Sequence, residues 1–265
     1  MAKQSGLHQI RGKVGEYSYY RQSGVASGLI RGINQGLSSR VKTGDEYANT
    51  RLNNAEFGAA CNVAGLLGRT VTPKYRPMIL PFSQSMMAKN ILELAKAHPA
   101  AWGQHVVTTD DTATMAEILS ETSKKKISDF MKLEIGVQGQ NTVEASIDLS
   151  ASQVSTLLTL GIDGLSIKIT TYLVRTGEYS QATDRILRGY VRQVDSTVID
   201  FDLEEGESAQ ETVTASMASL VPVVTGFNSH AFVTVVVMPY RKVNNSPYTL
   251  QEHCMFQSFK QPAQA

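Results

Sequence analysis

The second half of the chain consists of short segments in which apolar and polar residues alternate, and this pattern constrains the fold more than any other feature. The alternation occurs in residues 132–137, 143–149 and 165–174, and further strand candidates are residues 188–194, 197–203, 231–240 and 248–259. A period of two residues is typical of strands that bury one face, and turn-forming residues separate the segments. Residues 127–265 are therefore predicted to form an antiparallel β-sandwich, either immunoglobulin-like or jelly-roll-like.

Residues 44–126 show the spacing of helices instead. Apolar positions over Ala48–Leu67 recur every three or four residues, behind a Thr43–Glu46 segment with the residue types of a capping box. Gly68 is the predicted end of this helix, and further helices are predicted at about residues 83–97 and 112–121. Three alanines on one face of the first helix form a predicted interface that a partner can approach closely: Ala48, Ala55 and Ala59.

Residues 1–43 are rich in glycine and arginine and are predicted to form an arm. The aromatic run Tyr17–Tyr20 suits a strand, residues 22–24 suit a turn, and residues 25–30 suit the returning strand. These segments predict a β-hairpin over about residues 13–31, followed by an irregular tail at residues 32–42. The predicted fold class of the whole chain is α+β, with the hairpin arm and the helices preceding the β-sandwich.

Charge is distributed unevenly along the chain. Residues 1–89 contain twelve basic and four acidic residues, a net charge of +8, and the remaining residues carry −7. Identical subunits with a basic front and an acidic back attract one another head to tail, and salt weakens such contacts. The predicted contacts of the arm are Arg11, Arg21, Arg31 and Arg40, and the predicted acidic partner surface comprises Asp195, Asp200, Asp202, Glu204, Glu205 and Glu207.

Motifs that carry enzyme chemistry are not found in the sequence. The five histidines lack the spacing of zinc ligands, and no glycine-framed nucleophile or phosphate-binding loop occurs. The acidic pairs Asp110–Asp111 and Asp200–Asp202 are predicted to be solvated surface, and Cys61 and Cys254 are predicted to be reduced, buried thiols. We therefore expect no catalytic site, no cofactor and no metal. The sequence also lacks a run of about 18 apolar residues, so no membrane span is expected.

The front of the chain carries a distinctive series of motifs. Residues 10–15 read Ile-Arg-Gly-Lys-Val-Gly, the aromatic run Tyr17–Tyr20 follows, and residues 50–60 read Thr-Arg-Leu-Asn-Asn-Ala-Glu-Phe-Gly-Ala-Ala. Over about residues 1–70 this series resembles a group of uncharacterised proteins from Bacteroidetes bacteria, their phages and mobile elements. The resemblance implies a bacterial or phage setting and favours a component of a virus particle, and the group supplies no activity that can be carried over to this chain.

Two hypotheses for the function follow. The first is a non-enzymatic structural protein of the phage virion, a capsid-decorating, connector or tail component that acts as repeated copies and contacts itself and other virion proteins. The second is a nucleic-acid-associated protein that binds through its basic front, where arginine and lysine are interleaved with Tyr17, Tyr19 and Tyr20. An enzyme with a site in the sandwich is a third class, for which the sequence names no catalytic residues.

Overall fold

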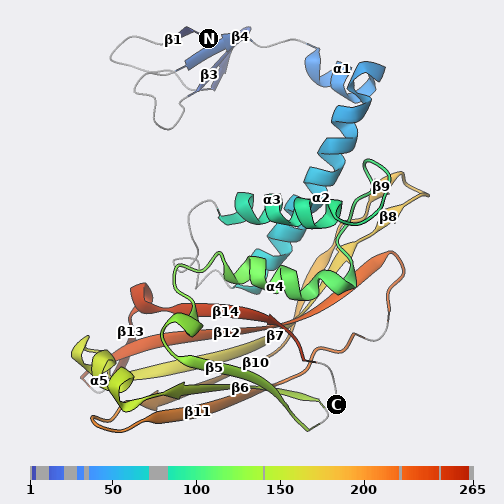
Figure 1. Cartoon of the computed structure of the whole chain (residues 1–265). Helices are drawn as coiled ribbons and strands as arrows, with labels where there is room; N and C mark the ends of the chain where they lie inside the picture. Colours follow the sequence, from blue (N-terminus) through green and yellow to red (C-terminus); the bar gives the residue numbers. More distant parts are fainter. Residues whose placement is uncertain are drawn as a thin grey trace. The chain divides into compact units, whose positions relative to one another are not determined.

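The computed structural model describes residues 2–3, 12–20, 29–32, 36–71, 83–139, 141–220, 223–244 and 246–262. The chain forms two compact units, Met1–Asn53 and Asn54–Ala265, and it passes from one to the other within helix α2 (Ala48–Thr70). Helices and antiparallel strands are both present (Figure 1), which confirms the predicted α+β class. The domain boundaries predicted at residues 43 and 126 remain predictions.

The first unit contains a small four-stranded antiparallel sheet with the order β1-β4-β3-β2. Its strands are β1 (Ala2–Lys3), β2 (Gly12–Val14), β3 (Tyr17–Tyr20) and β4 (Leu29–Gly32). Tyr17 lies opposite Gly32 and Tyr20 lies opposite Leu29, which agrees with the pairing predicted for the hairpin. The predicted turn at residues 22–24 lies outside the described residues, as do Arg11 and Arg21.

A short helix, α1 (Leu37–Thr43), replaces the irregular tail predicted for residues 32–42. Two basic residues stand in its last turn, where positive charge is favourable for the helix dipole. Arg51 also donates from Nη1 to the carbonyl oxygens of Val41 (3.1 Å) and Gly44 (2.7 Å), which satisfies acceptors at the end of the helix. These contacts come from seven and ten positions further along the chain, so the local pattern does not reveal them.

The capping box predicted at Thr43–Glu46 is not formed. Thr43 Oγ1 donates to the carbonyl oxygen of Ser39 at 3.1 Å, and the Glu46 carboxylate accepts a hydrogen bond from Arg40 at 3.1 Å. A 3-10 turn, η1 (Asp45–Tyr47), then leads directly into α2. The Thr43 hydroxyl and the Glu46 carboxylate thus stabilise the C-terminal end of α1, and not the first turn of α2.

Helix α2 buries a stripe that differs from its alanine face. The buried side chains are Glu56, Ala60, Val63, Ala64, Leu66, Leu67 and Thr70. Ala48 and Ala55 are exposed and Ala59 is half-buried, so small residues remain at the helix surface. The helix ends at Thr70 and not at the predicted Gly68. Burial of Thr70 and Val71 in the core outweighs the roughly 1 kcal/mol that a glycine costs a helix.

Two antiparallel sheets pack face to face in the second unit and confirm a sandwich-like arrangement (Figure 1). The larger sheet has the order β10-β7-β12, with β13 and β14 both on the far edge of β12, and the smaller has the order β11-β6-β5. The strands are β5 (Lys132–Gln138), β6 (Thr142–Leu149), β7 (Gly164–Gly177), β10 (Tyr190–Asp202), β11 (Ala209–Ser216), β12 (Phe227–Val243), β13 (Ser246–Thr249) and β14 (Met255–Lys260).

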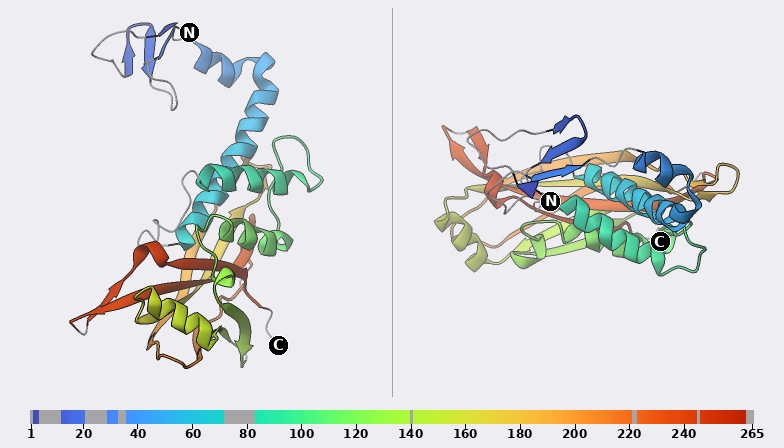
Figure 2. Two further views of the ribbon diagram at one scale, coloured as in Figure 1. Left: turned by 60° about the vertical axis from the view of Figure 1, so that its left-hand side comes forward. Right: turned by 90° about the horizontal axis from the view of Figure 1, so that it is seen from above.

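The long central strands divide their side chains between two cores. Ile167 and Ile169 of β7 lie in the core between the sheets, whereas Tyr172 and Val174 lie in a second core beneath the helices. That second core also receives side chains from α2, α3 (Ser83–Lys96) and α4 (Thr112–Ser120), so both further predicted helices are confirmed. The second unit therefore has three layers, helices on sheet on sheet, which Figure 2 shows from two further directions.

Several elements of the second unit depart from the predicted pattern. Residues 188–194 and 197–203 contribute to one strand, β10, whose register shifts between Gln193 and Asp195. The predicted strand at 248–259 is divided into β13, a 3-10 turn η5 (Gln251–His253) and β14. Elements absent from the prediction are helix α5 (Ala151–Thr159), strand β11, the hairpin strands β8 (Tyr179–Ser180) and β9 (Arg185–Ile186), and the 3-10 turns η3 (Thr109–Asp111) and η4 (Ile127–Asp129).

Candidate functional site

A groove of about 570 Å³ runs along α2 on the surface of the second unit. Helix α2 contributes Asn54, Ala55, Gly58, Ala59, Cys61, Asn62, Gly65, Leu66 and Arg69, α3 contributes Gln84, and the chain from β9 contributes Arg185, Ile186, Leu187 and Arg188. Two of the three predicted interface alanines, Ala55 and Ala59, therefore line the groove. The third, Ala48, belongs to the first unit.

Residues 185–188, at β9 and just after it, form one wall of the groove. Two contacts hold this wall in place. Gly177, the last residue of β7, lies so close to the carbonyl oxygen of Leu187 that a Cβ atom would overlap it. The backbone N–H of Gly189 donates to Asn62 Oδ1 of α2 at 3.1 Å. These contacts place Arg185 and Arg188 on the side of the groove that faces α2.

The groove is basic although the second unit as a whole is acidic. Residues 54–265 contain 17 basic and 21 acidic residues, a net charge of −4. Arg69, Arg185 and Arg188 are exposed, and none of them forms an ion pair with another residue in the described ranges. Guanidinium groups form paired hydrogen bonds with carboxylates and phosphates, so the groove suits an anionic ligand.

Two residues of the predicted acidic partner surface, Asp195 and Asp202, form hydrogen bonds within their own chain. Asp195 accepts from the backbone N–H groups of Ser216 (2.7 Å) and Ser196 (2.8 Å), and these bonds lower its pKa. Asp202 accepts from Lys242 Nζ (2.6 Å) and the Tyr240 hydroxyl (2.7 Å), and its pKa is lowered mainly by the lysine. Both aspartates therefore already have hydrogen-bond partners within their own chain.

The other four acidic residues of that surface are exposed: Asp200, Glu204, Glu205 and Glu207. Asp200 lies on β10, and the three glutamates lie in the turn between β10 and β11. Of the predicted arm contacts, Arg40 pairs with Glu46 of its own unit, and Arg31 lies in β4 with its side chain outside the described residues.

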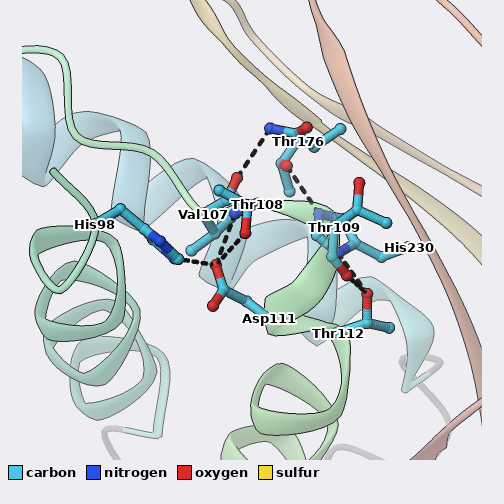
Figure 3. A network of polar contacts seen from close by, with 9 residues as sticks. His98, Val107, Thr108, Thr109, Asp111, Thr112, Thr176 and His230 are labelled. Carbon is cyan, nitrogen blue, oxygen red and sulfur yellow. Dashed lines mark hydrogen bonds and ion pairs between the residues drawn. The ribbon is translucent and has the colours of Figure 1, made fainter. Parts of the chain in front are cut away.

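A buried polar network lies between η3, α4 and the larger sheet (Figure 3). His98 Nε2 donates to Asp111 Oδ2 at 2.7 Å, and the same oxygen accepts from the backbone N–H of Thr108 at 2.7 Å. Asp111 is 7% exposed, so the prediction that Asp110–Asp111 is solvated surface is wrong for Asp111. Its carboxylate caps the turn that starts α4 and ties it to His98.

His230 of β12 lies on the side of this network that meets the larger sheet, and it is completely buried. Its Nδ1 is 2.9 Å from Thr112 Oγ1 and its Nε2 is 3.0 Å from Thr176 Oγ1. Thr112 already donates to the carbonyl oxygen of Thr109, so His230 donates from Nδ1 and accepts at Nε2 from Thr176. Burial lowers the pKa of His230 to about 4, so the ring is neutral and joins α4, β7 and β12.

Acid should destabilise the protein through His230. The ring takes up a proton near pH 6.5 when unfolded but only near pH 4 when folded, so stability is complete above pH 6.5 and falls as the pH drops towards 4. A tenfold difference in proton affinity is worth about 1.4 kcal/mol, which predicts a loss of about 3 kcal/mol over this range. Urea unfolding at several pH values measures it, and a His230→Gln variant should lose this part of the pH dependence. Equal slopes for the two proteins would contradict the assignment.

Glu56 of α2 forms a second buried polar cluster that the sequence pattern does not reveal. The carboxylate is 1% exposed, and Oε1 accepts from His105 Nδ1 (2.5 Å) and the backbone N–H of Gly103 (2.7 Å). Lys96 Nζ lies 3.7 Å from Oε2. Burial raises the pKa of Glu56, but the bonds from His105 and Gly103 and the nearby positive charges lower it by more than burial raises it. The net effect is a lowered pKa, so the carboxylate stays ionised.

The polar residues of the second unit thus act mainly as connections between elements. The Glu56–His105 pair joins α2 to the loop over residues 98–111, and the His98–Asp111 pair joins the two ends of that loop. Across the described ranges, no group of three or more histidine, cysteine, aspartate and glutamate residues is arranged to hold a metal. Cys254 is buried and Cys61 is half-buried, and neither forms a disulfide. No described helix is long and apolar enough to cross a membrane.

Comparisons with known proteins assign no family. No family model matches the chain, and no curated protein matches it. Nineteen chains of solved structures match, among them the sporulation control protein Spo0M from Bacillus subtilis, with 12% identity and a TM-score of 0.29. That match covers 51% of this chain and 49% of Spo0M. The chain therefore spans about half the length of that protein.

Proposed function

We propose that this protein is a non-enzymatic structural subunit of a bacteriophage particle, present in many copies that contact one another through the N-terminal unit. The observation that carries the proposal is the high exposure of the side chains that the structure describes in that unit. Of its described side chains only Leu29 is buried, while Val14 and Tyr17 are 54% and 51% exposed. A sheet of strands two to four residues long gains little stability alone.

The partner of the N-terminal unit is the acidic second unit of another copy. Residues 1–53 contain eight basic and three acidic residues, a net charge of +5, against −4 for residues 54–265. Opposite charges on the two units favour association between copies and select the orientation. Apolar side chains such as Val14 and Tyr17 would lose water on contact, which adds a hydrophobic contribution.

A capsid-decorating, connector or tail subunit of a virion would use such a combination. The layered second unit supplies a rigid body, and the small basic unit supplies the contact to the next copy or to another virion protein. The sequence resemblance to proteins of Bacteroidetes phages supports this setting, and the virion is accordingly the proposed location.

The solution mass of the purified full-length protein tests the proposal. Light scattering at low salt should give a discrete oligomer that resists nuclease treatment, and higher salt should shift the mass towards the monomer because exposed ion pairs are screened. A monomer at all protein and salt concentrations would overturn self-association. A mass that collapses on nuclease treatment would instead favour the second candidate, binding of nucleic acid through the basic front, for which exposed Tyr17 offers a stacking surface.

A further inference from the structure

We infer that the arginine groove on α2 receives the acidic turn between β10 and β11 of a second copy. The inference rests on the proposed function and adds a second contact between neighbouring copies, beside the one made by the N-terminal unit. The groove is defined by Arg69, Arg185 and Arg188, and the acidic turn by Glu204, Glu205 and Glu207.

The chemistry of the groove favours an acidic peptide. Ala55, Gly58 and Gly65 expose little beyond backbone and methyl groups, so another chain can approach α2 closely. The three arginines stand around this small-residue floor and can each bind a carboxylate. Among the described residues that line the groove none is aromatic, so these residues offer the bases of a single-stranded nucleic acid no side chain on which to stack.

The acidic turn has the matching form. Three exposed carboxylates fall within four residues, and Gly206 between them has a φ of 83°, which makes the chain reverse sharply. The turn is anchored at its base, because the backbone N–H of Leu203 donates to the carbonyl oxygen of Asp163 at 2.9 Å. No ion pair to Glu204, Glu205 or Glu207 is found among the described residues.

The groove and the turn lie at opposite ends of the larger sheet. Gly164 at the start of β7 pairs with Asp202, next to the turn, whereas Gly177 at its end touches Leu187 in the groove wall. A strand of 14 residues is about 45 Å long. The turn therefore cannot enter the groove of its own copy, and the contact is head to tail between copies. Repetition of such a contact closes into a ring or continues as a filament.

A charge exchange in the full-length protein tests the contact. One variant carries Arg185→Glu and Arg188→Glu, and the other carries Glu204→Lys and Glu205→Lys. Each alone should self-associate about tenfold more weakly than the wild type in sedimentation or light scattering. An equimolar mixture should regain association, because the reversed groove accepts the reversed turn and the unchanged groove accepts the unchanged turn. The control matched to the groove variant, Lys89→Glu with Lys124→Glu, lowers the net charge by the same amount on exposed residues outside both surfaces and should associate like the wild type.

The outcomes separate this inference from the proposed function. If the wild type associates and the groove and turn variants associate equally well, the groove contact is wrong and the N-terminal contact stands. If the variants are weakened but their mixture is not restored, the two surfaces do not meet and the inference is overturned. If the wild type does not associate at all, both proposals fail. Thermal unfolding of each variant identifies any loss of fold, and recovery in the mixture cannot come from unfolded chains.

Discussion

Removal of residues 1–43 is expected to abolish stable assembly and to leave a folded protein. Both hydrophobic cores of the second unit are built from residues after position 59, so the truncation removes none of their side chains. The groove and the acidic turn remain, but a few exposed ion pairs contribute only about 0.2–1 kcal/mol each and hold copies together weakly. Light scattering should show a monomer at protein concentrations where the full-length chain is oligomeric, while circular dichroism retains a cooperative unfolding transition.

A second variant separates the contribution of charge to assembly from the contribution of the contact area of the N-terminal unit. Replacing Arg11, Arg21, Arg31 and Arg40 with glutamine keeps the length of the arm and removes four positive charges. This variant should assemble more weakly than the wild type, with less dependence on salt, because the charged part of the attraction is lost. Normal assembly of the truncated protein would show that the N-terminal unit does not join the copies.

Replacing Glu56 with alanine is expected to lower the free energy of unfolding by about 3 kcal/mol, because the change leaves buried donors without a partner. The carboxylate holds His105 and the backbone N–H of Gly103 against α2, and both bonds are lost. The matched variant Glu56→Gln retains an acceptor oxygen of similar shape and should cost about 1 kcal/mol. Urea unfolding at pH 7 compares the three proteins. A loss below about 0.5 kcal/mol in Glu56→Ala would show that the cluster does not stabilise the fold.

The pH dependence of the same variant provides a second readout. The pKa of Glu56 is lowered in the folded state, so its contribution is present above the ordinary value of 4.5 and is lost as the pH falls through the lowered pKa. The difference in stability between the wild type and Glu56→Gln should therefore shrink in strong acid. The loss through His230 occurs at higher pH, between about 6.5 and 4, and the two effects are separable.

Elements whose burial follows a simple period were predicted from the sequence. Residues 165–174 and 231–240 alternate or are continuously apolar, and they lie in β7 and β12, the strands with a core on each face. Helices α3 and α4 were predicted nearly residue for residue. Strand β11 was missed because it begins in an acidic run and carries mostly threonine, alanine and polar residues. Helix α5 was missed although Ser150 and Gln153 form a capping box that a search for this pattern would have found.

The candidate site likewise contains residues that the sequence predicted and residues that it did not. The small-residue face of α2 and the acidic run over β10 and the following turn are local patterns, and residues from both entered the predicted interfaces. Arg185 and Arg188 were not singled out, because nothing near them in the sequence indicates that Gly177 and Asn62 bring them beside α2. Sequence alone likewise could not separate Asp195 and Asp202, whose partners are 21 and 40 residues away, from the free carboxylates around them.

The sequence by itself determined the class of the fold, the order of its main elements and the opposite charges of its two ends, because periodicity and composition are properties of neighbouring residues. Only the tertiary structure decided which polar side chains form hydrogen bonds or ion pairs within the chain. Glu56, Asp111 and His230 are buried with hydrogen-bond partners that lie 3 to 118 residues away in the sequence, and burial of a polar group is costly when such partners are missing. The same folding leaves three arginines and three glutamates exposed at opposite ends of one sheet.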